Sequence, residues 1–277
     1  MSVVLEHRLI TDCPFALVNP FDVDRDLWVD LPHHPLSAPR LSALPGQLPV
    51  LVDLLKLSFT SRLELVQRAW DWKRANERPL FCGFIKSTEP VERMVRHLGR
   101  RLLIKNTSDE QLFLRFYDPR VFEHLCWIFT PAQLASLMGP AEAWYWPTRC
   151  GEWQKTVRPE LKTYSLILEP QQLLSLGRIS ILNRILKNLH RREPSNALDI
   201  TSVRQIESCL RRALDDGLSE AADLQLYVFQ ALQFGAGIHR HPTLANALQT
   251  VRMGHSTYVG ACLRINDEEL HHSKEAQ

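Results

Sequence analysis

The stretch FLRFYDPRVF, from Phe113 to Phe122, gathers two arginines, a tyrosine and an aspartate within ten residues. A general acid or base at Asp118 would need a second carboxylate or a histidine nearby, and Glu123 and His124 are the closest candidates in the sequence. Asp118 followed by proline is also the signature of a helix start, where the carboxylate accepts hydrogen bonds from backbone N–H groups. We therefore interpret the stretch as a structural junction, with a hydrolase using Asp118 or His255 as an alternative; the junction comprises Arg115, Tyr117, Asp118, Pro119 and Arg120.

Histidine pairs are the next candidates for chemistry. They occur at His33–His34, at His239 with His241, and at His271–His272. None has the spacing of the helical zinc motif, in which two histidines lie four residues apart with a glutamate beside the first. The chain also has no GxSxG elbow, no phosphate-binding glycine loop and no dinucleotide fingerprint. We predict no metal site, no cofactor and no enzymatic activity.

The charge balance and the cysteines narrow the class of protein. The 277 residues carry 33 basic and 31 acidic side chains, a net charge of +2, which argues against a nucleic-acid partner. The six cysteines form no CxxC pair, as is typical of reduced thiols in a cytoplasm. Neither an export signal nor an apolar run long enough to span a membrane is visible. We expect a cytoplasmic protein without membrane insertion.

The first part of the chain mixes strands and helices without strict alternation. Strands are predicted at FALVNP (15–20), VLVDLL (50–55), LFCGFIKS (80–87), AEAWYWPT (141–148) and GEWQKTV (151–157). Helices are predicted after a capping box of Ser61 and Glu64, over 89–101, after Asp118, and after Thr130 with Gln133. In the first of these helices, helical spacing relates Leu63, Val66, Ala69, Trp70 and Lys73. The Pro-rich segment 31–49 is expected to lie outside the core.

A hairpin is predicted to lead into the Asp118 stretch, with strands over LLIKN (102–106) and QLFLRFY (111–117). Strand alternation would then place Phe113, Arg115 and Tyr117 on one face and the apolar residues between them on the other.

From about residue 169 the pattern becomes helical throughout. Apolar residues recur at helical spacing in four successive segments, with Ser219 expected to cap the third and Pro242 to start the fourth. We predict an α+β protein, with an N-terminal mixed α/β lobe containing a small sheet at residues 1–160 and an all-helical lobe at 161–277.

Tryptophans and basic residues near the boundary between the lobes suggest a docking surface for a protein partner, because Trp and Arg carry much of the binding energy at interfaces. Core packing of the tryptophans and solvation of the basic helix face are the alternatives. The candidate partner-binding residues are Trp144, Trp146, Trp153, Arg184, Lys187, Arg191 and Arg192.

The combination RFYDPRVFEHL…LASLMGPAEAWYWP resembles the adaptor, or chaperone, family of bacterial type VI secretion. FALVNP, LPVLVDL and RHLGRRLLI resemble further motifs of that family in the same order, so the resemblance spans Phe15 to Trp153. The Pro- and His-rich segment between Val23 and Val50 departs from the family pattern.

The resemblance implies a bacterial adaptor that binds a cognate secreted effector, usually a toxin, and loads it onto a VgrG or PAAR spike protein. It implies binding surfaces and no reaction centre. An immunity-type protein that neutralises a toxin is the alternative from another class.

Overall fold

The computed structural model describes residues 6–37, 41, 48–106, 108–149, 151–161, 166–192, 199–263, 265 and 270. The chain forms two compact units, Met1–Leu176 and Gly177–Gln277. The division falls within helix α6 (Pro170–Arg192), whereas the sequence-based boundary lay at residue 160. The first residues of this helix pack on the N-terminal unit, where Leu173 and Leu176 contact its core.

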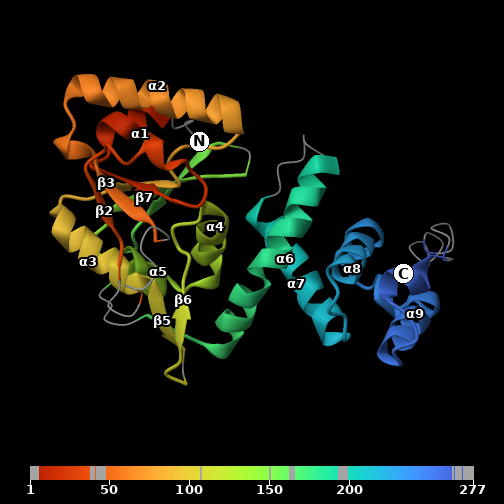
Figure 1. The fold of residues 1–277 in the computed structure, drawn as a ribbon. Helices are drawn as coiled ribbons and strands as arrows, with labels where there is room; N and C mark the ends of the chain where they lie inside the picture. The colour runs from red at the N-terminus through yellow and green to blue at the C-terminus, as the bar shows by residue number, and fades with distance from the viewer. Residues whose placement is uncertain are drawn as a thin grey trace. The chain divides into compact units, whose positions relative to one another are not determined.

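A six-stranded sheet forms the centre of the N-terminal unit (Figure 1). Each pair of neighbouring strands is antiparallel. The strand order is β2 (His33–Pro35), β3 (Val50–Asp53), β1 (Phe15–Val18), β4 (Gly83–Lys86), β7 (Ala143–Pro147) and β8 (Trp153–Val157). All four residues of β1 are buried, since this strand has neighbours on both sides and helices on both faces.

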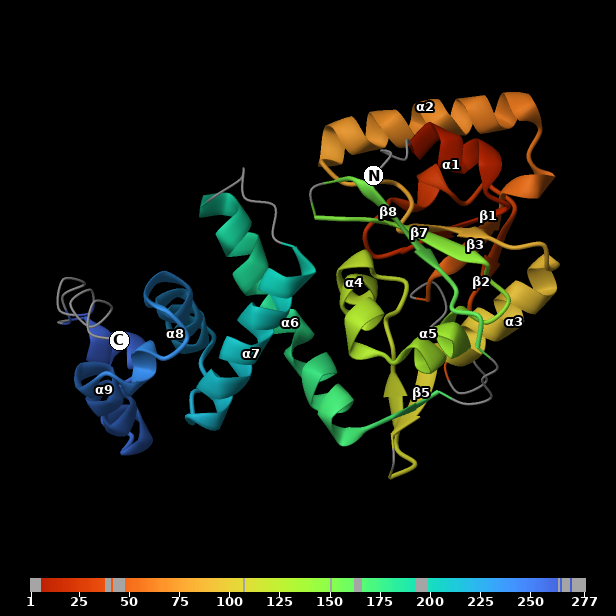
Figure 2. The ribbon, with the colours of Figure 1, turned by 180° about the vertical axis from the view of Figure 1, so that it is seen from behind.

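Helices cover both faces of this sheet, as the two opposite views show (Figures 1 and 2). One face carries α1 (Glu6–Asp12) and α2 (Phe59–Asn76), and the other carries α3 (Val91–Arg101), α4 (Pro119–Ile128) and α5 (Pro131–Met138). The alternation of β1 divides the core accordingly. Ala16 and Val18 pack with α1 and α2, while Phe15 and Leu17 pack with the other three helices. The predicted α+β class is confirmed, with a larger sheet than expected.

Helix α2 differs from its sequence-based prediction in its cap, and its predicted helical stripe is only partly buried. Its N-cap is Ser58, whose side chain accepts from the backbone N–H of Ser61, so the predicted capping box is wrong. Leu65 and Ala69 are its buried residues, whereas Leu63 and Trp70 are about half exposed. The helix carries two overlapping apolar sets, and contact with α1 and the sheet decides which of them is buried.

The Pro-rich segment 31–49 contributes to the core, contrary to expectation. Its described part contains β2, which pairs with β3. Leu31, Leu36 and Leu48 are buried, and the Leu36 N–H donates to the Pro49 carbonyl at 2.8 Å. Pairing with β3 satisfies backbone groups that proline-rich chain would otherwise expose.

A second, three-stranded sheet lies at the edge of the N-terminal unit. The predicted hairpin is present as β5 (Leu103–Asn106) and β6 (Gln111–Phe113), and β9 (Ile167–Leu168), which the sequence did not indicate, pairs with β5 in parallel. Strand β6 ends at Phe113, four residues before the predicted end at Tyr117. Short 3-10 helices occur at Arg25–Leu27 and Leu54–Lys56.

The described residues of the C-terminal unit are helical, as predicted. Besides the end of α6 they form α7 (Ile200–Asp215), α8 (Ala221–Phe234), a 3-10 helix at Ile238–Arg240, α9 (Pro242–Arg252) and α10 (Tyr258–Cys262). Pro242 starts α9 as expected, but α8 has Glu220 and not Ser219 at its N-cap position. Buried Asp223 accepts the backbone N–H groups of Tyr258 and Val259 at 3.0 and 2.9 Å, which fixes the start of α10.

Within the part of the chain that the structure describes, no helix combines the length and apolar character needed to cross a membrane.

Candidate functional site

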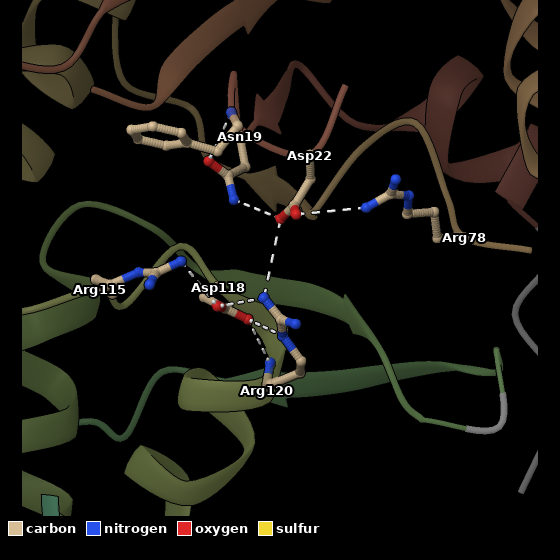
Figure 3. A network of polar contacts seen from close by, with 7 residues as sticks. Asn19, Asp22, Arg78, Arg115, Asp118 and Arg120 are labelled. Atoms are coloured by element: carbon tan, nitrogen blue, oxygen red, sulfur yellow. Dashed lines mark hydrogen bonds and ion pairs between the residues drawn. The ribbon is translucent and has the colours of Figure 1, made fainter. Parts of the chain in front are cut away.

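Asp118 stands at the N-terminus of α4, where its carboxylate is almost fully buried (Figure 3). Its Oδ1 accepts the backbone N–H of Arg120 at 3.0 Å, as a helix cap does. The Arg120 guanidinium adds two bonds, Nε to Oδ1 at 2.9 Å and Nη2 to Oδ2 at 2.8 Å. Arg115 reaches Oδ2 from the other side at 3.3 Å. The predicted helix start and both arginine contacts are therefore present.

A second carboxylate, Asp22, extends this cluster to two other parts of the chain (Figure 3). Arg120 Nη2 lies 3.9 Å from Asp22 Oδ2, and Arg78 Nη1 lies 3.5 Å from Asp22 Oδ1. Asn19, buried directly after β1, donates from Nδ2 to Asp22 Oδ2 at 2.5 Å. We call this set the Asp118 junction; its members are Asn19, Asp22, Arg78, Arg115, Asp118 and Arg120.

Tyr117 does not lie where strand alternation placed it. Because β6 ends at Phe113, the next residues turn toward α4, and both Phe116 and Tyr117 are buried while Arg115 remains half exposed. Burial raises the pKa of the Tyr117 hydroxyl, which disfavours its anionic form. The residue acts as a core side chain beside the junction, and the prediction of a shared face with Phe113 and Arg115 is wrong.

The groups that could assist Asp118 in acid–base chemistry are themselves engaged. Arg149 donates from Nε to Glu123 Oε2 at 3.0 Å, and its Nη2 lies 3.0 Å from Nε2 of the fully buried His124. Asp118 itself accepts hydrogen bonds from two guanidinium groups and a backbone N–H, which hold its side chain in place. This arrangement suits a structural cap.

The histidine pairs do not assemble a metal site among the residues that can be described. No group of three or more His, Cys, Asp or Glu side chains that could hold a metal ion occurs there. His239 is buried and stacks on Tyr227 with ring centroids 3.4 Å apart. His255 is exposed, and the pair at residues 271 and 272 lies outside the described residues.

The three candidate tryptophans are core residues in the structure. Trp144, Trp146 and Trp153 expose 1%, 8% and 6% of their surface. Trp144 stacks on Phe122 at 4.9 Å, Trp146 donates from Nε1 to Thr156 Oγ1 at 3.1 Å, and Trp153 packs against Phe84 at 5.0 Å. Core packing, the alternative that the sequence left open for them, is what the structure shows.

The candidate basic residues on α6 are exposed. Arg184, Lys187 and Arg191 lie on its surface, and the exposed Arg192 places its guanidinium 4.5 Å from the Phe229 ring centroid of α8. Both α8 and this part of α6 belong to the C-terminal unit, so the cation–π contact stabilises that unit.

Helix α2 presents an exposed apolar surface, which includes Leu63 and Trp70 from its predicted helical stripe. Phe59, Leu63 and Trp70 expose 73%, 49% and 51% of their surface, and Leu55 just before the helix exposes 64%. Positions 59, 63 and 70 share one side of the helix, since they are separated by four and seven residues. We call these three residues the α2 apolar line. Figures 1 and 2 show α2 as the outermost element on its side of the sheet.

The comparison with known proteins matches one part of the chain to a family model. A family model described as a domain of unknown function (DUF4123) matches residues 32–136, the segment from the start of β2 to α5. Four members of the Asp118 junction lie within the matched range: Arg78, Arg115, Asp118 and Arg120. No curated protein and no solved structure is similar enough to the chain to be matched.

Proposed function

We propose that this protein is a non-enzymatic adaptor of bacterial type VI secretion. It binds a cognate toxic effector in the cytoplasm and promotes its loading onto a VgrG or PAAR spike protein. The observation that carries the proposal is the DUF4123 match at residues 32–136, because that domain family is known for adaptors of type VI effectors. The motifs with the family resemblance, from Phe15 to Trp153, enclose the matched segment.

The α2 apolar line supports a binding role. Large exposed apolar side chains gathered on one face often mark a protein-interaction site, and aromatic residues are enriched among those that dominate binding energy. Phe59 and Trp70 provide two such residues on a rigid, 18-residue helix. In the proposed mechanism this surface covers apolar segments of the effector until the effector is transferred to the spike.

The two units offer surfaces of different chemistry, which suits an adaptor with two partners. The N-terminal unit presents the apolar line, and the C-terminal unit presents the basic side chains Arg184, Lys187 and Arg191. We assign one partner to each unit.

The test is co-expression of the protein with the effector and spike proteins encoded beside its gene, followed by affinity purification. The variant Leu63→Ser/Trp70→Ser should reduce co-purification of one partner by about tenfold or more, as expected when interface residues of this type are truncated. Its melting temperature should stay close to that of the wild type, since exposed substitutions change stability little.

The matched control is Glu64→Ser/Asp71→Ser, which changes two exposed residues one position further along the same helix. The control should retain its partners. Failure of the wild type to retain either an effector or a spike protein would contradict the adaptor function. Inhibition of the effector's toxic activity by the purified protein would instead favour the immunity-type alternative.

A further inference from the structure

A basic cavity lies in the N-terminal unit between α3 and α5. Its volume is about 680 Å³, and residues beyond β8 complete its wall. The lining contains five arginines and two glutamates: Arg93, Arg96, Arg100, Arg101, Arg158, Glu89 and Glu142. Arginine therefore dominates the charge of this cavity, although the chain as a whole is nearly neutral.

The carboxylates of the lining leave much of this positive charge uncompensated. Glu89 pairs with Arg93 at 2.7 Å. Arg101, which is partly buried, donates from Nη2 to the hydroxyl of Ser136 at 3.0 Å, and its buried Nε has no hydrogen-bond partner among the described residues. Burial and the neighbouring Arg100 lower the pKa of Arg101. An anion in the cavity would supply the opposite charge.

His97, in the cavity wall, also lies in the positive electrostatic field of the arginines. Its Nε2 lies 2.9 Å from the Leu137 carbonyl, which fits a proton on Nε2 and a neutral ring. Burial lowers the pKa of His97 to about 4, and the charges of Arg101, Arg100 and Arg93 add to this effect. Gly139, with φ of +54°, passes directly against the imidazole, and a Cβ at that position would overlap the ring. The wall is thus closely packed around the imidazole of His97.

The arginines are spaced so that they can pair with several carboxylates, rather than with a single small anion. Arg93, Arg96 and Arg100 recur at intervals of three and four residues along one side of α3, a span of about 10 Å at 1.5 Å per residue. Guanidinium groups bind carboxylates in a paired, planar geometry. The cavity volume also falls in the range of sites that hold a drug-sized molecule.

We propose that this cavity binds an acidic segment of a protein partner, with neighbouring carboxylates paired to the arginines of α3. The inference rests on the proposed adaptor function, since it names the chemistry of a segment that the adaptor recognises. It concerns a different surface from the α2 apolar line.

The experiment measures binding of a fluorescein-labelled hexaglutamate peptide to the full-length protein by fluorescence anisotropy at low ionic strength. A labelled hexaglutamine peptide tests whether the carboxylates are needed, and it should not bind. The variant Arg96→Gln/Arg100→Gln, which changes two exposed side chains, should weaken hexaglutamate binding by about tenfold or more.

The control variant Arg8→Gln/Arg25→Gln removes the same net charge from two exposed positions of the N-terminal unit outside the cavity. It should bind hexaglutamate nearly as tightly as the wild type. Equal weakening in both variants would overturn the proposal, because binding would then depend on net charge alone. Tighter binding of inorganic phosphate than of the peptide would also overturn it, since the cavity would then be a phosphate site.

NMR spectra of the His97 ring at pH 7 give a second readout. His97 lies in the cavity wall, so saturating hexaglutamate should shift its ring resonances, whereas hexaglutamine should not. Unchanged His97 resonances at saturating peptide would place the peptide elsewhere and overturn the proposal. The experiment needs no natural partner, so its failure is distinguishable from a failure of the adaptor function, which co-purification tests.

Discussion

Each of the two units buries a carboxylate against arginine, and the two arrangements differ in their access to water. In the N-terminal unit, Asp118 is paired with Arg115 and Arg120, whose side chains are 48% and 58% exposed. In the C-terminal unit, Glu207 of α7 is paired with Arg178 of α6, and both side chains are only about one-tenth exposed. Arg178 Nε donates to Glu207 Oε1 at 2.8 Å, and Nη2 contacts the same oxygen.

The difference shows that contacts between similar residue types can contribute unequally to stability. Asp118 is held by a backbone N–H and by neighbours two and three residues away, so removing one arginine leaves the others and water to solvate the carboxylate. The Arg178–Glu207 pair joins two helices across 29 residues of sequence, where little water can replace a missing charge. Loss of one partner of a buried pair is therefore expected to cost more than loss of one partner at the junction.

The largest effect is predicted for Glu207→Gln. Removing the negative charge opposite buried Arg178 should lower the free energy of unfolding by about 3 kcal/mol, measured by urea denaturation. Asp215→Asn, an exposed acid-to-amide substitution in this unit, should change it by less than about 0.5 kcal/mol. The double variant Arg178→Met/Glu207→Leu should recover most of the loss, because apolar side chains can replace a buried ion pair. An equal loss of stability in Glu207→Gln and in its exposed control would contradict the greater importance of the buried pair.

Acid should destabilise the helical unit through His239. Burial lowers the pKa of His239 to about 3, with a smaller effect of Arg212, whereas an unfolded histidine titrates near 6.5. Below about pH 6.5 the unfolded chain binds a proton that the folded chain does not, so stability falls as the pH falls toward 3. Between pH 7 and pH 4.5 this histidine should account for a loss of about 2 to 3 kcal/mol.

The measurement is the difference in denaturation free energy between the wild type and His239→Phe at both pH values. Phenylalanine keeps an aromatic ring against Tyr227 and takes up no proton, so the variant should lose less stability on acidification. His97 in the N-terminal unit, with a pKa of about 4, retains its own acid sensitivity in this variant. The same pH dependence in variant and wild type would rule out His239 as the cause.

A smaller effect is predicted for Asp118. Replacement by Ala removes the helix cap and should cost about 1 kcal/mol, whereas Asn keeps an N-cap acceptor and should cost less. Thermal and urea denaturation of both variants provide the measurement. Equal losses for Asn and Ala would show that charge pairing, and not capping, dominates at this position.

The smallest effects are predicted for Arg115 and Arg120, the two arginines that pair with Asp118. Arg120→Ala should cost more than Arg115→Ala, because Arg120 makes two bonds to Asp118 and also lies near Asp22. Both losses should remain below about 1 kcal/mol, since the side chains are half exposed. Partner co-purification with each variant, compared at equal stability, decides whether either arginine also contacts a partner.

Sequence patterns were most reliable where a structure depends on adjacent residues. The start of α4 at Asp118–Pro119 and the capping box of Thr130 and Gln133 are present as predicted. These features depend on backbone N–H groups within four residues, so the local sequence contains all the necessary information. The faces of α2 could not be predicted in the same way, because both Leu63 and Leu65 belong to plausible apolar stripes.

The Asp118 junction contains contacts between neighbours in the sequence and contacts between distant segments. Its capping contact and both arginine pairs lie within FLRFYDPRVF and were predicted. Asn19, Asp22 and Arg78 were missed, since these residues approach Asp118 only through the pairing of β1 with β4 and the end of α2. A lone Asn or Asp in a loop has no spacing signal that distinguishes such a role.

The sequence by itself determined the α+β class, most strands, the helix starts that have local caps, and the motifs that resemble an adaptor family. Only the tertiary structure decided that the tryptophans of β7 and β8 are buried, that α2 exposes an apolar line, and that the arginines of α3 line a cavity. The physical reason is range: caps and strand periodicity act over a few residues, whereas burial and clustered charge depend on which distant elements pack together.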